Sequence, residues 1–491
     1  MLACRSKFEM TRPSPPNQYP PGLPATGPEP SPNALLEDLE SAGVAFETSL
    51  STRADHGRDW WPLSIIDVAQ GRVPHWPGVV VRPTSTEEVS RVLVIASRHR
   101  VAVTPQGGRS GVVGGAVAPD GGIALDLTGL DRILQLDEVS GTLSVEAGVF
   151  GPEVEEYLNA RGFTLGHFPQ SFNISTVGGW LACRGAGQFS NRYGKIEDMV
   201  RGLTVVLANG DVLNLGDRGP RQAVGPDLLQ LFVGSEGTLG VITRATLVVR
   251  ATAPHTLRRA FAFASFDDGL GACRRILQRG ASPAVLRLYD ERESQRIFHV
   301  DAHVLIVLDE GDPTLCEATM NVVHEECDHA TALADSLVTI WLDHRNDVSA
   351  LAPLWEGGLV VDTIEVAGPW STLAAMRDRV VSALEALPST LVVSVHQSHA
   401  YVDGACLYFT FAGRPEPDPV AYYRLAWDVA TRAVLSSGGS LSHHHGVGRN
   451  RARFVKEALG GAFALLESLK ESLDPHHLMN PGVLGVGGEP W

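Results

Sequence analysis

The sequence predicts an α+β fold, and three observations lead to this class. Strand-like and helix-like stretches alternate along the 491 residues without a strict strand–helix–strand repeat, which argues against a doubly wound sheet. Asn209-Gly210 separates two apolar runs within residues 203–215, and Asn-Gly at such a place is the strongest short signal for a hairpin. Apolar residues make up 44% and charged residues 20%, so the chain can bury a core; its length suggests two large domains or about three smaller ones.

The chain opens with a tail that is not expected to fold. Residues 13–32 hold nine prolines together with Ser, Gly and Asn, a composition that cannot bury enough apolar surface to offset the entropy of ordering. Residues 1–33 are therefore predicted to be a disordered tail. A helix is predicted to follow from Asn33, because Leu35, Leu36 and Leu39 recur at helical spacing.

Residues 34–252 are predicted to form the first domain. Short β-branched runs predict its strands, and Ser85-Thr86-Glu87-Glu88 predicts a helix start of the capping-box kind. A second helix is predicted from Pro152 to Ala160. The predicted strands are residues 78–83, 101–105, 123–127, 133–137, 143–148, 162–166 and 241–250, together with the hairpin.

Residues 253–430 are predicted to form a second α+β domain, and residues 431–491 a carboxyl-terminal segment. A helix near the boundary, over 421–437, is expected to end at Gly438-Gly439, which suits a glycine C-cap. The other predicted helices are 267–279, 314–335, 368–387 and 450–473, and the predicted strands are 304–308, 391–395 and 406–411.

Composition and charge exclude several classes of protein. The formal charge is −16, from 40 basic and 56 acidic residues, which argues against a nucleic-acid binder with its basic patches. No run of about 18 apolar residues occurs, so no transmembrane helix is expected. The start MLACRSKFEM lacks an apolar signal core, and the six cysteines form no Cys-x-x-Cys pair. These features predict a cytoplasmic protein without a disulfide scaffold or a four-cysteine zinc site.

Three stretches rich in glycine and serine give the first indication of function. They are PQGGRSGVVGG at 105–115, SFNISTVGGWLACRGAGQFSNRYGKIEDMV at 171–200 and GSEGTLGVIT at 234–243. Glycines after a strand let backbone N–H groups approach a phosphate without a clash from a Cβ atom. The first stretch lacks Gly-Lys-Ser/Thr and has the wrong spacing for Gly-x-Gly-x-x-Gly, so it is neither a P-loop nor that dinucleotide motif. Taken alone, it is equally consistent with a plain glycine-rich turn.

In this order, the three stretches resemble the FAD-binding domain of the vanillyl-alcohol oxidase/p-cresol methylhydroxylase superfamily. The resemblance implies a two-subdomain FAD-binding domain of the p-cresol methylhydroxylase type, an α+β cap domain and a C-terminal segment that returns to the flavin site. Some relatives carry in the first loop a histidine that bonds covalently to the flavin; Arg109 stands at that place here, which implies non-covalent FAD. The residues implied to hold FAD are Pro105, Gly107, Gly108, Arg109, Ser110, Gly111, Ser175, Thr176, Gly178, Gly179, Glu236, Gly237, Thr238, Gly240 and Ile242.

The second half of the chain resembles the alkyldihydroxyacetonephosphate synthase branch of this superfamily. SLSHHHGVG at 440–448 matches that branch, whereas the 2-hydroxy acid dehydrogenases have Glu-His-Gly there, so His444 stands in place of their metal-binding glutamate. Tyr408, in GACLYF, takes the place of one of their two metal-binding histidines, and His399 could correspond to the other. A phenol must lose a proton with a pKa of about 10 before it binds a metal well. No metal site is therefore expected.

This resemblance implies an exchange of the acyl group of acyl-dihydroxyacetone phosphate for a fatty alcohol, without net redox change. Arginine side chains would supply fork-shaped donors to the phosphate. The histidines and the tyrosine are expected to titrate near neutrality, with pKa values lowered further in a shared apolar pocket. The residues implied to be catalytic are Tyr408, His443, His444 and His445, and those implied to bind substrate are Arg287, Arg345 and His167.

Other interpretations remain open. The histidine triplet could be a solvated loop, Arg287 could pair with Asp290, and Tyr408 could be a core aromatic. His396 and His399, three apart on a predicted strand, are expected to face opposite sides and to serve structure. For the whole chain, an FAD-linked dehydrogenase or oxidase of a 2-hydroxy acid or another alcohol is the alternative, and an idle flavin- or lipid-binding protein is a third. A lipid-like phosphate substrate, a homodimer and peripheral membrane contact are further expectations.

Overall fold

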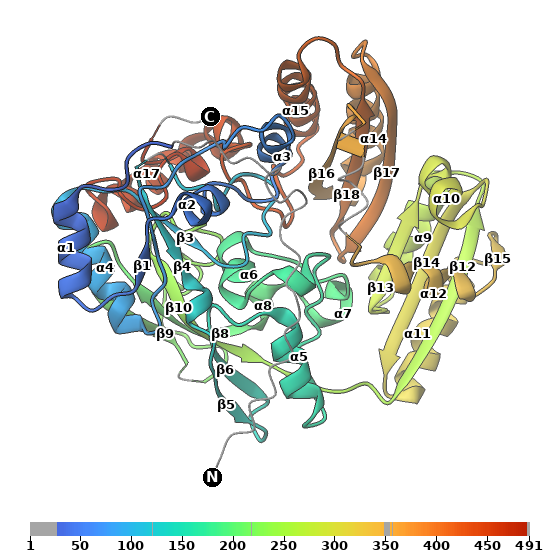
Figure 1. The fold of residues 1–491 in the computed structure, drawn as a ribbon. Helices are drawn as coiled ribbons and strands as arrows, with labels where there is room; N and C mark the ends of the chain where they lie inside the picture. The colour runs from blue at the N-terminus through green and yellow to red at the C-terminus, as the bar shows by residue number, and fades with distance from the viewer. Residues whose placement is uncertain (1–26, 120, 218, 348–353, 356, 489–491) are drawn as a thin grey trace.

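The computed structural model describes residues 27–488 apart from residues 120, 218, 348–353 and 356 (Figure 1). Its amino-terminal domain contains two sheets. The first has the strand order β1-β2-β4-β3, in which β2, β4 and β3 run parallel and β1 is antiparallel to β2. The elements of this part are α1 (Asn33–Ser41), β1 (Phe46–Glu47), α2 (Leu50–His56), α3 (Pro62–Ala69), β2 (Val79–Val81), α4 (Thr86–His99), β3 (Val103–Gln106) and β4 (Ile123–Asp126).

Helices α1 and α4 pack on this sheet because each carries apolar side chains at helical spacing. Leu35 and Leu39 of α1 are buried in one core with Val89 of α4 and residues of the strands. The predicted start of α4 is confirmed, since Ser85 Oγ accepts the backbone N–H of Glu88 at 3.2 Å.

The second sheet is antiparallel, with the strand order β5-β6-β10-β8-β9. The predicted hairpin is confirmed as β8 and β9: Gly210 has a φ of 89°, and the Asp211 N–H bonds to Asn209 Oδ1 at 3.0 Å. The elements of this part are η1 (Leu127–Gly129), β5 (Ile133–Asp137), β6 (Thr142–Glu146), α5 (Gly151–Asn159), β7 (Phe163–Thr164), η2 (Phe172–Ile174), α6 (Val177–Cys183), α7 (Ser190–Tyr193), α8 (Ile196–Met199), β8 (Val200–Val206), β9 (Val212–Gly216), β10 (Val241–Val248) and β11 (Arg250–Ala251).

The cap domain is one antiparallel sheet of seven strands with the order β15-β12-β14-β13-β17-β18-β16 (Figure 1). Helices α9, α11, α14 and α15 share an apolar core on one face of this sheet. The elements are β12 (His255–Phe263), α9 (Phe266–Gln278), β13 (Val285–Tyr289), α10 (Glu291–Phe298), β14 (His303–Gly311), α11 (Pro313–Glu326), β15 (Thr331–Leu333), α12 (Ser336–His344), β16 (Val360–Pro369), α14 (Trp370–Glu385), β17 (Thr390–Ala400), β18 (Gly404–Gly413) and α15 (Pro419–Ser436).

Two predicted helices differ from the structure. The helix predicted over 314–335 ends at Glu326, and Thr331–Leu333 instead forms the edge strand β15, because pairing with β12 satisfies its backbone groups. The helix predicted over 450–473 is divided into α16 (Ala452–Leu459) and α17 (Phe463–Leu473) by the turn η4 (Gly460–Ala462). Gly460 has a φ of 53°, which a continuous α-helix does not contain.

The carboxyl-terminal segment returns to the amino-terminal domain, as expected. Met479 pairs with Val103 of β3, and the Val103 N–H donates to the Leu478 carbonyl at 2.8 Å. Leu469 and Leu473 of α17 pack against the core of the second sheet of that domain; α17 is drawn in red in Figure 1. The predicted C-cap is confirmed at Gly438, where φ is 74°, so α15 continues past residue 430 and the segment starts after it. The last element is η5 (Val483–Gly485).

Most of the predicted tail, residues 1–26, lies outside the described residues. Residues 27–32 were also predicted to be disordered, but they lie on the amino-terminal domain: the Ser31 N–H donates to the Gly78 carbonyl at 3.1 Å, and Arg53 donates to the Pro28 carbonyl at 3.0 Å. Among the described helices, none has both the length and the apolar character needed to cross a membrane.

Candidate active site

A cavity of about 540 Å³ lies between the amino-terminal domain and the cap. All three glycine-rich stretches line it from the amino-terminal domain, strands β13, β16, β17 and β18 line it from the cap, and the histidine loop lines it from the carboxyl-terminal segment. The structure thus brings together parts of the chain that are more than 300 residues apart in sequence, from Gly107 to His445.

The first glycine stretch packs closely on the second. A Cβ atom added to Gly108 would lie 1.9 Å from the carbonyl oxygen of Ile174, and one added to Gly107 would lie 2.2 Å from Thr176 Oγ1. Side chains at these two positions would therefore displace the loop that lines the cavity. Arg109, with a φ of 54°, turns its guanidinium to Asp55 at 2.7 Å.

The third stretch is tied to the histidine loop by a buried carboxylate. Glu236 accepts the N–H groups of Val447 at 2.7 Å and Gly448 at 2.8 Å. Burial raises the pKa of Glu236 to about 7, although these two hydrogen bonds act in the opposite direction. Gly237, with a φ of 74°, has the left-handed backbone that glycine adopts without strain.

Fourteen of the fifteen residues implied to hold FAD line the cavity. Thr238 is the exception: it is fully buried, and its hydroxyl donates to the Ser235 carbonyl at 2.7 Å. Glycines without room for a side chain, along the wall of a large cavity, fit a long cofactor that lies against backbone N–H groups. The residues that line the cavity as expected are Pro105, Gly107, Gly108, Arg109, Ser110, Gly111, Ser175, Thr176, Gly178, Gly179, Glu236, Gly237, Gly240 and Ile242.

The polar face of the cap sheet forms the other wall. Residue pairing places Tyr289, His396, Tyr408 and Glu365 in one row across β13, β17, β18 and β16. Directly opposed residues of antiparallel strands project to the same face, so these four side chains share the face opposite to the helices. Tyr408 stacks on His396, with ring centroids 4.8 Å apart.

Arg287 is held in this wall by neighbouring polar side chains. Its Nη2 donates to His396 Nε2 at 2.8 Å, and its Nε donates to the Tyr289 hydroxyl at 3.0 Å. Since a guanidinium only donates, His396 Nε2 must be an acceptor, and His396 Nδ1 then donates to Glu293 at 3.0 Å. Arg287 pairs with His396 and Tyr289 rather than with Asp290, the alternative that its sequence allowed.

Arg345, like Arg287, lies close to the ring of Trp341. The guanidinium carbon of Arg345 is 5.2 Å from the centre of the Phe168 ring and 5.0 Å from that of Phe189. The Trp341 ring lies near both arginines, 5.4 Å from the guanidinium carbon of Arg287 and 5.9 Å from that of Arg345. Burial lowers the pKa of Arg345. Neither arginine forms an ion pair with a described carboxylate, so both keep a cationic group available to an anion in the cavity.

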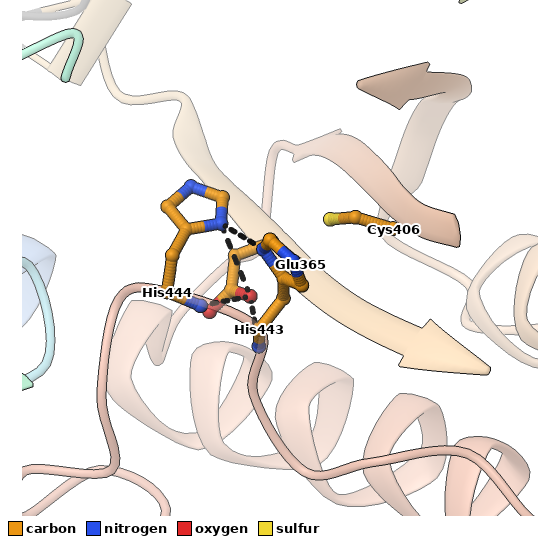
Figure 2. Close-up of side chains that lie close together, drawn as sticks. All are labelled: Glu365, Cys406, His443 and His444. Atoms are coloured by element: carbon orange, nitrogen blue, oxygen red, sulfur yellow. Dashed lines mark hydrogen bonds and ion pairs between the residues drawn. The ribbon is translucent and has the colours of Figure 1, made fainter. Parts of the chain in front are cut away.

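The histidine triplet is fixed by Glu365, which is fully buried (Figure 2). The Glu365 carboxylate accepts the backbone N–H groups of His443, His444 and His445 and pairs with Arg451 at 2.9 Å, while Ser442 donates its hydroxyl at 2.7 Å. Burial alone would raise the pKa of Glu365, but Arg451 and the other neighbours lower it to about 2. The carboxylate therefore stays ionised and holds the loop.

Glu365, Cys406, His443 and His444 also place possible metal-ligand atoms within 4.8 Å of one another (Figure 2). Each carboxylate oxygen offers about two lone pairs, and the five donors already described occupy them. Burial, with Glu365 nearby, keeps the pKa of the Cys406 thiol well above its ordinary value. The residues present therefore do not fit a metal ion.

The triplet and Tyr408 do not titrate near neutrality as predicted. Burial is the main cause in each case: it lowers the pKa of His443 to about 3, that of His445 to about 4 and that of His444 well below its ordinary value. The same burial raises the pKa of Tyr408, so the predicted lowering is wrong for the phenol. An apolar environment disfavours the charged form of either group, and this leaves a neutral cluster. His444, His445 and Tyr408 line the cavity, whereas His443 lies behind them.

His167, expected to bind substrate, does not line the cavity. It is fully buried, 4.7 Å from the Trp180 ring, and neither ring nitrogen has a hydrogen-bond partner among the described residues. His396 and His399 both line the cavity, in contrast to the prediction. The register of β17 is irregular between Gln397 and Ala400, and this breaks the alternation on which that prediction relied.

Two models of known families match the chain. One, described as an FAD binding domain, covers residues 77–216, and the other, described as the C-terminal domain of FAD linked oxidases, covers residues 254–484. The FAD-linked oxidoreductase YgcU of Escherichia coli strain K12 is 31% identical over 433 residues, which are 83% of this chain and 89% of YgcU. The chain belongs to the FAD-linked oxidases. FAD is therefore its cofactor, and the glycine-lined cavity fits it.

Alkyldihydroxyacetonephosphate synthase is among the relatives of this FAD-linked oxidase. The synthase of Dictyostelium discoideum is 30% identical over 461 residues, which are 85% of this chain and 74% of the synthase. A solved structure of an alkyldihydroxyacetonephosphate synthase has a TM-score of 0.79 at 27% identity and covers 93% of this chain and 87% of that one. p-Cresol methylhydroxylase, at 16% identity and a TM-score of 0.74, confirms the fold, covering 93% of this chain and 97% of that one.

Glu365 is the main functional residue that the sequence did not predict. The only signal is that two acids, Asp362 and Glu365, stand in the mainly apolar run VVDTIEVAG, which indicates burial but not what Glu365 binds. Tyr401 and Trp341, which contact the triplet or the arginines, also carried no motif, and Lys195 lay in the second glycine-rich stretch without an assigned role. Their contacts depend on elements far apart in the chain.

Glu365→Gln is expected to lower the free energy of unfolding by about 3–5 kcal/mol, because it leaves the buried Arg451 without a countercharge. Denaturant unfolding measures the change. The matched control is Glu385→Gln, since Glu385 pairs with Arg292 at the surface with 43% and 55% of their side chains exposed. That control should cost less than about 1 kcal/mol. Equal effects of the two variants would contradict the anchoring role of Glu365.

His167→Phe is expected to stabilise the protein selectively at low pH. Burial, with Lys195 nearby, lowers the pKa of His167 to about 3, so between pH 6.5 and 3 the unfolded chain binds the proton and the folded protein does not. The neutral buried histidine therefore lowers the free energy of unfolding of wild type as pH falls below 6.5. Denaturant unfolding measures the free energy of unfolding of the variant minus that of wild type. This difference should be about 2 kcal/mol larger at pH 5 than at pH 8. A difference independent of pH would show that His167 has a partner for its charged form.

Gly108→Ala is expected to weaken FAD binding by about tenfold or more, because the new methyl group overlaps the Ile174 carbonyl and moves the loop. Titration of the flavin-free variant with FAD measures this, and acid precipitation of wild type should release the flavin if it is non-covalent. Gly461→Ala is the control, since no atom lies within 4 Å of an added Cβ there. Unchanged affinity of Gly108→Ala would place FAD elsewhere.

Proposed function

We propose that this FAD-linked oxidase acts as an alkyldihydroxyacetonephosphate synthase, exchanging the acyl group of acyl-dihydroxyacetone phosphate for a fatty alcohol. The observation that carries the proposal is the neutral cluster of His444, His445 and Tyr408 in the cavity wall, in place of a metal site. Two arginines that form no ion pair with a described carboxylate face the same cavity. The relationship to synthases at 27–30% identity supports this choice.

The arginines suit a phosphate dianion. Arg287 and Arg345 lie 5.4 and 5.9 Å from the Trp341 ring, and each guanidinium can donate two parallel hydrogen bonds to phosphate oxygens. Aromatic rings beside both cations exclude water, which strengthens their attraction for an anion. They would bind and orient the head group of the substrate.

The cluster suits proton transfer. A neutral imidazole is a base, and burial keeps His444 and His445 neutral at physiological pH. The Tyr408 hydroxyl lies 3.4 Å from His445 Nε2 and remains a donor, because burial raises its pKa. These groups can take protons from the substrate carbon and the incoming alcohol. FAD, when bound, supplies the ring chemistry that protein side chains lack.

The apolar part of the cavity suits an alkyl chain. Trp60, Pro62, Ile65 and Trp355 line the cavity. Ile65 and Trp355 share an apolar core with Val361 of the edge strand β16, which lies three strands from β13, the strand of Arg287. Burial of a hydrocarbon chain against such residues gains about 0.8 kcal/mol per methylene group. An amphiphilic substrate would thus have its charge at one side and its chain at the other.

The alternative is an FAD-linked oxidation of a 2-hydroxy acid or another alcohol. YgcU, described as an oxidoreductase, favours it, and two arginines can bind a carboxylate as well as a phosphate. Reduction of an artificial electron acceptor on addition of such a substrate would support this alternative.

Incubation of the FAD-loaded enzyme with palmitoyl-dihydroxyacetone phosphate and labelled hexadecanol should yield an alkyl ether. Arg287→Gln or Arg345→Gln should raise the KM for the phosphate substrate by about 10- to 150-fold, since a charge-assisted hydrogen bond contributes about 1.5–3 kcal/mol. Arg432→Gln removes a cation that is 64% exposed and pairs with Glu457, and serves as the control. A flavin-loaded wild type that forms no ether would contradict the proposed function.

A further inference from the structure

A hydrogen-bonded row of side chains leads away from the cavity behind His444. His444 Nδ1 lies 3.0 Å from His443 Nδ1, and His443 Nε2 lies 2.8 Å from the Tyr401 hydroxyl. Figure 2 shows the first contact, with the other nitrogen of His444 on the far side of its ring. His444 lines the cavity, whereas His443 and Tyr401 do not. Tyr401 is partly exposed, so the row extends from the cavity toward the outside.

The geometry restricts where protons can lie. Two imidazole nitrogens at 3.0 Å share one proton, so one Nδ1 donates and the other accepts. If His443 donates, Tyr401 donates to His443 Nε2, and His444 carries its proton on Nε2. If His444 donates, His443 Nε2 donates to Tyr401, and His444 Nε2 is free to accept a proton. The row therefore has two neutral arrangements, one with a base and one with an acid at the cavity.

A third arrangement, with a charged imidazole, is disfavoured by the surroundings. Lys195 Nζ donates to the His443 carbonyl at 2.7 Å, and Arg451 pairs with Glu365, the carboxylate that lies 3.7 Å from His444 Nδ1. His399 stacks on His443 with ring centroids 4.9 Å apart, and its Nδ1 is 2.7 Å from Ser190 Oγ. Burial, followed by the neighbouring cations and rings, lowers the pKa values of His399 and His444 well below their ordinary value. A proton taken from the cavity must therefore be passed on.

We propose that Tyr401 and His443 form a relay that carries away the proton that His444 takes from the substrate. Tyr401 acts through His443 and is a positioning and relay residue, not a group that touches substrate. This inference rests on the proposed function only in assuming that the substrate proton reaches His444.

The transfer balances without any charged imidazole. The substrate proton bonds to His444 Nε2, and the electron pair of the broken bond stays on the substrate. At the same time the His444 Nδ1 proton passes to His443 Nδ1, and the His443 Nε2 proton passes to the Tyr401 oxygen. Tyr401 releases its own hydroxyl proton to water, and Ser190 is within hydrogen-bonding reach of that hydroxyl. The reverse sequence returns a proton.

The backbone holds Tyr401 at this place. Its N–H donates to the Gly404 carbonyl at 2.8 Å, and its carbonyl accepts the indole N–H of Trp370 at 3.0 Å. Removal of only the hydroxyl should therefore leave the chain path unchanged. Burial keeps the pKa of Tyr401 above its ordinary value, so the phenol exchanges protons while remaining neutral.

Tyr401→Phe tests the relay in the FAD-loaded enzyme. With palmitoyl-dihydroxyacetone phosphate in deuterium oxide, we expect the variant to incorporate deuterium at the substrate carbon, and to turn over, about 10- to 100-fold more slowly than wild type. KM should change less than twofold, because Tyr401 does not line the cavity. The control is Tyr422→Phe, which removes a hydroxyl bonded to Thr390 at 2.8 Å. A Tyr401→Phe enzyme as fast as this control would overturn the relay.

A second readout does not depend on turnover. Long-range nitrogen–proton spectra of the holoenzyme with isotope-labelled histidine report which ring nitrogen carries the proton. We expect the His444 signals of wild type to average over both arrangements, and those of Tyr401→Phe to show one. Averaging that persists in Tyr401→Phe, or a single arrangement in wild type, overturns the relay. If the spectra behave as expected but wild type forms no ether, the proposed function fails and the relay stands. Ser190→Ala provides a second variant should Tyr401→Phe not fold.

Discussion

The structure depends on one buried ion pair, between Glu365 and Arg451. Two side chains without solvent contact carry opposite charges 2.9 Å apart. The lone pairs of Glu365 find further donors, whereas Arg451 Nε and Nη2 have no hydrogen-bond partner among the described residues. The Glu365 carboxylate accepts hydrogen bonds from three consecutive backbone N–H groups, so the histidine loop has little freedom to move along the cap strand. Glu236 holds the following residues, Val447 and Gly448, from the amino-terminal domain. One loop is thus fixed from both sides of the cavity by carboxylates.

The two carboxylates differ in charge because only one has a cation. Arg451 keeps Glu365 ionised, whereas burial without an ion pair raises the pKa of Glu236 to about 7. Glu236 lines the cavity beside glycines that fit FAD, so its protonation responds to whatever lies there. The ionised Glu365 therefore fixes the histidine loop to the cap. The contact of the loop with Glu236 depends on the protonation state of that carboxyl group.

Local chemistry explains how much of this could be predicted from sequence. Gly107 and Gly108 were recognisable because their role follows from the lack of a side chain, and α4 was recognisable because Ser85 and Glu88 are neighbours in sequence. Glu365 was not, since its partners are more than 75 residues away. The β17 irregularity at Gln397 could not be predicted either, because it depends on the register with β18. Nor could the sequence show that His444 and His445 line the cavity and His443 does not, because that also depends on distant parts of the chain.

The charge of the substrate and the strength of the base are linked in this cavity. Burial, Lys195 and Arg451 oppose an additional positive charge on the histidine triplet, and Glu365 only partly offsets them. A bound phosphate dianion reverses this balance, because an anion close to an imidazole favours its protonated form. Under the proposed function, the cluster would accept a proton more readily with the phosphate substrate bound than when an uncharged alcohol enters alone. Recognition of the head group by Arg287 and Arg345 would then be coupled to proton removal, and a long apolar chain by itself would not provide that coupling.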